Sequence, residues 1–140
     1  MKQPLWIKRK HPRVKTDIHC EVGLPNNDLS VPNNDLSDGQ ILDLSVDGLK
    51  FGCVRHTIHN ILPENRRTPG PVMDIVVEIH FELQLPDLTA QAVKCKATLI
   101  HFERLAQEKY HVGVQFINMN NTATNALEAF LETALEKQKI

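Results

Sequence analysis

The sequence predicts a mainly β protein, a six-stranded antiparallel β-barrel with one C-terminal α-helix. Apolar and polar residues alternate with a period of two over the first two thirds of the chain, which is typical of strands with one buried face. Short turn-forming stretches separate these segments, as in antiparallel hairpins. After Asn121 the period becomes helical. A lone amphipathic helix must cover a side or an end of the barrel, or bind a partner.

The first strand is expected after the basic N-terminus, with Val14, Thr16, Ile18, Cys20 and Val22 on its buried face. A near-tandem duplication, 24–30 and 31–37, follows. It is rich in turn formers, so we interpret it as a long surface loop. Two short strands, 40–45 and 49–54, come next and are joined through Asp47-Gly48. This dipeptide is a strong hairpin signal because both residues tolerate positive φ.

The second half of the predicted barrel begins after a polar stretch, 55–70, that we expect to be another long loop. The clearest alternation, at 73–85, predicts a strand with Met73, Ile75, Val77, Ile79, Phe81, Leu83 and Leu85 inward. Further strands are expected at about 91–103 and 109–117, so the barrel spans about 14–117. The helix is expected at about 122–138. Its candidate N-caps are Asn121, Thr122 and Thr124.

Composition limits the class of protein. A chain of 140 residues fits one domain, and 41% apolar with 24% charged residues excludes disordered, collagen-like and disulfide-dense chains. Charged side chains interrupt the longest apolar stretch, so no membrane insertion is expected. Three cysteines cannot all pair, and their spacing matches no zinc or redox motif. Together with the lack of a secretion signal, this predicts a cytoplasmic protein in a reducing compartment.

Charge is distributed unevenly along the chain. Residues 1–16 hold six basic and no acidic side chains, whereas the other 124 residues hold 10 basic and 17 acidic ones. We therefore predict a flexible basic N-terminal arm at 1–8 and a single domain at 9–140. A basic arm on an acidic body indicates an anionic ligand or partner for the arm.

The first functional motif is Arg9-Lys10-His11-Pro12-Arg13. Pro12 lacks an amide hydrogen and favours extended geometry for His11, so the stretch is not expected inside a helix. Residues four apart in an extended chain point the same way, and a bend brings them closer. Two guanidinium groups on one side of the chain suit an elongated anion, because arginine matches both guanine and phosphate.

The second motif is Asp43-Leu44-Ser45-Val46-Asp47-Gly48. Alternation predicts that Leu42 and Leu44 face the core, so Asp43 and Ser45 should project together from the outer face. Asp43 can accept hydrogen bonds from guanine N1–H and N2–H₂, and Ser45 can donate to phosphate or hold the arm. Gly48 is expected to supply the turn.

These two motifs, in this order and on these elements, resemble the bacterial PilZ domain family. His111-Val112-Gly113-Val114-Gln115-Phe116 is similar to the last barrel strand of that family, and the resemblance spans roughly 7–135. It implies a receptor for cyclic di-GMP (c-di-GMP) in which Arg9 and Arg13 contact guanine and phosphate. Asp43 and Ser45 would contact guanine or phosphate, and Gly48 would form the turn.

The residues around the first arginine belong to the same expected site. Lys8 stands where some members of the family have another arginine, and we include Lys10 with it. The resemblance further implies that Ile7 and Lys8 form a switch that folds over bound ligand. We add that Trp6 stacks on a base. Whether one ligand or an intercalated pair binds stays open.

The expected function is that of a receptor or adaptor that changes conformation or partner affinity when c-di-GMP binds. The family implies motility, adhesion or polysaccharide secretion as the regulated process, through a downstream protein partner. We expect no catalysis, because no catalytic motif is visible, and no cofactor. His56 and His59 have the nearest spacing to a metal site but lack further ligands, so no metal is expected.

Two other functions are compatible with a basic arm. In the first, the same fold binds no ligand and the arm docks on an acidic protein partner. In the second, the barrel binds nucleic acid. We do not expect this, because the body is acidic and aromatic residues make up only 5% of the chain, which leaves few stacking platforms.

Overall fold

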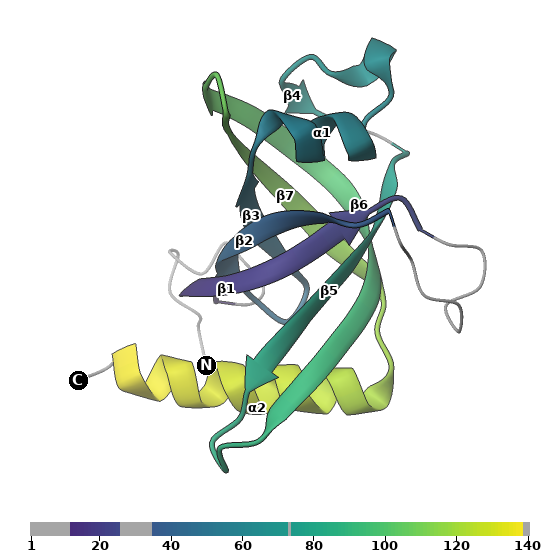
Figure 1. The fold of residues 1–140 in the computed structure, drawn as a ribbon. Helices are drawn as coiled ribbons and strands as arrows, with labels where there is room; N and C mark the ends of the chain where they lie inside the picture. The colour runs from purple at the N-terminus through teal and green to yellow at the C-terminus, as the bar shows by residue number, and fades with distance from the viewer. Residues whose placement is uncertain (1–11, 26–34, 73, 139–140) are drawn as a thin grey trace, which may run out of the picture.

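Six long antiparallel strands close into a barrel in the computed structural model, which describes residues 12–25, 35–72 and 74–138. The strands are β1 (Val14–Gly23), β2 (Ser37–Leu44), β3 (Gly48–Cys53), β5 (Val76–Gln84), β6 (Ala90–Ala106) and β7 (Lys109–Asn118). Each pairs with two neighbours in the order β6-β5-β1-β2-β3-β7, and β7 pairs back with β6 (Figure 1). This confirms the predicted fold class. A two-residue strand, β4 (Gly70–Pro71), adds to β6 from outside the ring.

The predicted alternation holds over most of the barrel. The interior is filled by the apolar faces of all six strands, among which Phe51, Ile79, Leu99 and Val112 are at most 1% exposed. Cys20 and Cys95 are buried as well. Burial raises the pKa of both thiols, and that of the half-buried Cys53, to about 12. The raised pKa values disfavour the thiolate form, so these cysteines are suited to packing rather than to nucleophilic attack.

The stretch 55–70 is not the simple loop that the sequence predicts. It contains a helix, α1 (Arg55–Ile61), and a 3₁₀ turn, η1 (Glu64–Arg66). Helix α1 lies over one end of the barrel (Figure 1). It buries Ile58 and Ile61, and the Thr57 hydroxyl donates to the Asp38 carbonyl. Seven residues with a few apolar positions are too short for a helical period to be visible, so tertiary burial decides this segment.

Helix α2 (Asn121–Gln138) lies across the opposite end of the barrel from α1 (Figure 1). Its buried face contains Ala123, Ala126, Leu127 and Leu131, which are at most 6% exposed. The predicted N-caps are wrong, because the cap is Asn120. Its side-chain oxygen accepts the Ala123 amide at 2.8 Å. Among the described residues, no helix is long and apolar enough to span a membrane.

The middle of the duplication, 26–34, lies outside the described residues. Its second copy ends in a strand rather than in a loop, because β2 begins at Ser37, three residues before the predicted start. Within the described residues, the two helices lie at the ends of the barrel and leave the outer face of β2, β3, β6 and β7 uncovered (Figure 1).

Candidate ligand-binding site

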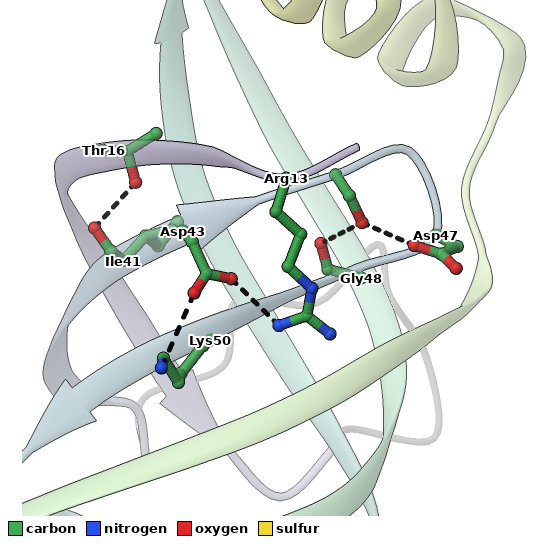
Figure 2. A network of polar contacts seen from close by, with 8 residues as sticks. Arg13, Thr16, Ile41, Asp43, Asp47, Gly48 and Lys50 are labelled. Carbon is green, nitrogen blue, oxygen red and sulfur yellow. Dashed lines mark hydrogen bonds and ion pairs between the residues drawn. The ribbon is translucent and has the colours of Figure 1, made fainter. Parts of the chain in front are cut away.

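The two sequence motifs meet at an ion pair on the outer face of the barrel. Arg13 lies directly before β1, and its Nη1 donates to Asp43 Oδ1 of β2 at 3.1 Å (Figure 2). On the other side of the same carboxylate, Lys50 Nζ of β3 lies 3.7 Å from Oδ2. Asp43 is thus held between two cations. The side chains of Arg13 and Lys50 are each more than a third exposed, so both remain available to a ligand.

A β-bulge turns Asp43 outward. Ile41 pairs with Phe51 and Asp43 pairs with Lys50, so Leu42 is an extra residue on β2. The bulge inverts the alternation. Ile41 takes the core position that the sequence assigned to Leu42, and Leu42 is only half-buried. Beside the bulge, the Thr16 hydroxyl of β1 donates to the Ile41 carbonyl at 2.8 Å, which closes the gap in the ladder (Figure 2).

The sequence predicts that Ser45 projects from the outer face beside Asp43, but the structure shows that it does not. It is 1% exposed, and its hydroxyl lies within hydrogen-bonding distance of the Asp47 carboxylate and the Gly48 carbonyl. Its backbone amide also donates to the Gly48 carbonyl at 2.9 Å. Strand β2 ends at Leu44, so the period of two no longer applies and Ser45 turns into the loop. The polar groups of Ser45 therefore hold the β2–β3 turn together.

Gly48 is needed for a reason other than the predicted one. Gly70 is the only glycine of the described chain with positive φ, so Gly48 does not use that freedom. A Cβ atom at Gly48 would lie 2.2 Å from the Val114 carbonyl oxygen of β7. The Asp47 carbonyl accepts the Phe116 amide at 2.8 Å, which holds the turn against β7. Glycine is required because two backbones approach closely here.

A pocket of about 480 Å³ lies next to Arg13 on the outer face of β3, β6 and β7. In the strand register, Lys50 is opposite Gly113, and Gly113 is opposite His101. A Cβ atom at Gly113 would meet nothing closer than the His101 carbonyl oxygen at 3.8 Å. Gly113 therefore leaves a shallow floor between a lysine and a histidine. The lining also includes Asp47, Gly48, Glu103, His111 and Gln115.

His111 stands at the edge of this pocket. Its Nδ1 lies 3.8 Å from Glu103 Oε1, and its side chain is 20% exposed. Burial lowers the pKa of His111, and the Lys50 charge lowers it further, against a smaller opposing effect of Glu103. Both burial and the Lys50 charge thus favour the neutral imidazole.

A second groove of about 560 Å³ lies beside β1 and β5, and its described lining is net negative. Asp17, Glu21 and Glu82 line it, and Lys94 is the only lysine or arginine among its described lining residues. An anionic ligand would be repelled there. The pocket beside Arg13 is therefore the better candidate for an anion, although it is the smaller of the two.

Sequence reasoning missed Lys50, His101, His111 and Gly113 as pocket residues. Part of the signal was present, because pairing Leu44 with Leu49 across the turn places Lys50 opposite Asp43. The inward Val112 likewise places His111 and Gly113 outward. The contribution of β6 could not be found in this way, because its register against β7 shifts at several bulges.

Lys8, Arg9 and Lys10 lie outside the described residues, as do Trp6 and Ile7. Within residues 12–25, 35–72 and 74–138, no group of three or more histidine, cysteine, aspartate or glutamate side chains is placed to hold a metal ion.

Comparison with known proteins gives the family. The family model described as PilZ domain matches residues 7–133, most of the chain and both motifs. The chain belongs to the PilZ domain family. A search of curated proteins found no significant match to the sequence.

Several solved structures share the fold at low identity. The chain is similar to the Bacillus subtilis inhibitor of motility MotI/DgrA, with a TM-score of 0.60 at 10% identity over 94% of this chain and 51% of that one. K. pneumonia MrkH in complex with c-di-GMP matches with a TM-score of 0.59 at 13% identity, over 94% of this chain and 54% of that one. The PilZ domain of Escherichia coli YcgR with c-di-GMP matches with a TM-score of 0.53 at 15% identity, over 94% of this chain and 98% of that one. The chain therefore spans about half the length of MotI and MrkH but nearly all of the YcgR domain.

Proposed function

We propose that this PilZ protein is a c-di-GMP receptor that binds the dinucleotide between Arg13 and the Gly113 floor. The observation that carries the proposal is the 3.1 Å contact between Arg13 and Asp43, because it brings the two motifs to one surface. Family membership supports it, as do the solved structures of MrkH and YcgR with c-di-GMP, whose folds are similar.

The groups on this surface match the chemistry of the ligand. The guanidinium of Arg13 presents parallel N–H donors to a guanine O6/N7 edge or to phosphate oxygens. The Asp43 carboxylate can accept hydrogen bonds from guanine N1–H and N2–H₂. The ligand replaces contacts that these side chains make with each other, since Arg13 turns from a carboxylate to a phosphate or base. A planar base can lie over Gly113, where no side chain stands in the way.

Ser45 and Gly48 serve the proposed site by fixing the turn. Asp43 and Gly48 lie on the two strands that this turn joins, and the buried Ser45 hydroxyl holds the turn closed. In this proposal, the two residues set the position of the binding surface rather than form most of its contacts.

Arg9, Lys8 and Lys10 complete the proposed site. Arg9 precedes Arg13 by four residues, so its backbone lies within about 14 Å of Arg13. This reach lets both arginines contact one ligand. Three further positive charges on this segment strengthen attraction for a dianion.

We further propose that binding changes the conformation of the protein or its affinity for a downstream protein partner, without chemistry on the ligand. The ligand must favour the responding state by about 1–3 kcal/mol to act as a switch. The family suggests motility, adhesion or polysaccharide secretion as the regulated process. It also suggests that the protein acts in the cytoplasm.

Isothermal titration calorimetry with c-di-GMP tests the proposal. Wild-type protein should bind, and Arg13→Ala and Asp43→Ala should each lose about 1–3 kcal/mol of binding free energy. Arg55→Ala is a matched control. Arg55 is as exposed as Arg13 and forms an ion pair with Glu108, away from the pocket. Its affinity should equal that of wild type.

Two results would overturn the proposal. The first is the absence of binding heat in a folded wild-type protein, and the second is equal affinity for wild type and both site variants. If no heat is seen but the protein forms a salt-sensitive complex with an acidic partner, the ligand-free interaction module is the correct function.

A further inference from the structure

The described lining of the pocket carries little positive charge to attract its proposed ligand, and the three cations at 8–10 lie outside the described residues. Arg13 and Lys50 contribute two cations, and Asp47 and Glu103 contribute two carboxylates, so the lining has no net charge when its histidines are neutral. Asp43 contacts both cations and lowers the potential further. The phosphates of c-di-GMP bring two negative charges. A further positive charge at the pocket edge would therefore strengthen binding.

His111 is the residue best placed to supply this charge. It lies on β7 and lines the pocket together with Lys50 and Glu103. Its Nδ1 is 3.8 Å from the Glu103 carboxylate, whose negative charge favours the protonated form of the ring. His111 belongs to neither of the two sequence motifs.

We propose that His111 is a further ligand-binding residue, which takes up a proton when c-di-GMP binds and contacts a phosphate as an imidazolium ion. The inference rests on the proposed function. It adds the residue that contacts a phosphate and the protonation state in which it does so.

The groups around His111 give the sign of the effect. Lys50 on β3 and Lys109 on β7 lower its pKa, and Glu103 on β6 and Asp43 on β2 raise it, while burial is the largest effect and lowers it. Arg13 and His101 face the same pocket. A phosphate beside Lys50 offsets the lysine charge and favours the imidazolium ion, so the pKa of His111 rises in the complex.

This rise makes binding depend on pH. The gain in affinity is complete below the pKa of His111 in the free protein and is lost as the pH rises through its pKa in the complex. Each unit of difference between the two pKa values corresponds to about a tenfold change in affinity. We therefore expect tighter binding at about pH 6 than at about pH 8.

Calorimetric titration of the full chain with c-di-GMP in buffers of different ionisation enthalpy measures the protons taken up. Wild type should take up a fraction of a proton per bound ligand near neutral pH. It should also bind at least about threefold more tightly at about pH 6 than at about pH 8. His111→Gln keeps a hydrogen-bonding side chain without a titrating group, so it should lose both the uptake and most of the pH dependence. His59→Gln, an exposed histidine of α1 away from the pocket, is the control and should keep both.

The outcomes separate this inference from the proposed function. Binding of c-di-GMP that releases or takes up no proton and has the same pH dependence in His111→Gln overturns the role of His111 and leaves the receptor function intact. Absence of binding by folded wild type at every pH overturns both. His111→Asn repeats the test in case the glutamine variant unfolds.

Discussion

The motif from Asp43 to Gly48 consists of two regions with different physical roles. Asp43 is at the surface, where Arg13 and Lys50 contact it through solvent-accessible ion pairs. Ser45 and Gly48 are buried, and their contacts are with the turn itself and with the backbone of β7. The first region can exchange its partners for a ligand, and the second cannot do so without opening the turn.

This difference shows that one sequence motif can combine recognition and architecture. Exposed ion pairs contribute little to stability, so the surface region can be altered with little effect on folding. A buried hydrogen-bonded turn and a close backbone contact contribute more. Substitutions should therefore separate into those that change stability and those that change ligand affinity.

Gly48→Ala should have the largest effect. The added Cβ would lie 2.2 Å from the Val114 carbonyl oxygen, so β3 and β7 would have to move apart. We expect the free energy of unfolding to fall by about 3 kcal/mol or more. Chemical denaturation followed by circular dichroism measures this. Stability close to that of wild type would show that the close approach does not restrict residue 48.

Gly113→Val should have the next largest effect, and on binding rather than on stability. Gly113 does not have positive φ and has open space around it, so a valine is accommodated on the strand. Its side chain would fill the floor of the pocket and lower the affinity for c-di-GMP by at least about tenfold, which is about 1.4 kcal/mol. Unchanged affinity in a stable Gly113→Val variant would place the ligand elsewhere.

Ser45→Ala should reduce stability by about 1 kcal/mol, because the hydroxyl that holds the turn is lost. Any loss of affinity should be smaller than for Asp43→Ala, since Ser45 acts through the turn. Denaturation and calorimetry on the same protein sample compare the two quantities. A large loss of affinity with full stability would restore the direct phosphate contact that the sequence suggested.

Asp43→Ala should have the smallest effect on stability, below about 1 kcal/mol, because its ion pairs are partly exposed. The same substitution is expected to weaken binding, which makes it the opposite of Gly48→Ala. A thermal melt of the ligand-free protein checks the first part. A drop in stability as large as that of Gly48→Ala would remove the distinction between the two regions.

The strands and the terminal helix could be predicted because long segments alternate with a clear period. The residues from Val77 to Leu83 that the alternation places inward are buried as expected. Helix α1 could not be predicted, since its seven residues are stabilised by burial at the end of the barrel. The bulge at Leu42 could not be predicted either, because one extra residue in a strand has no characteristic sequence pattern here.

For the site, the sequence predicted that Arg13 and Asp43 lie together, and the structure agrees. The direction of Ser45 could not be deduced, because it depends on where β2 ends. The pocket residues His101 and His111 come from strands far along the chain. Only the register of β6 and β7 brings them beside Lys50 and Arg13.

Nuclear magnetic resonance mapping of the c-di-GMP site tests the central claim most directly. In a titration of isotope-labelled protein, the backbone amides of Lys50, His111 and Gly113 should shift most, together with that of Arg13. Amides in the acidic groove, such as those of Asp17 and Glu82, should not change. Shifts centred on that groove, or on α1, would contradict a ligand site formed by Arg13, Asp43 and the glycine floor.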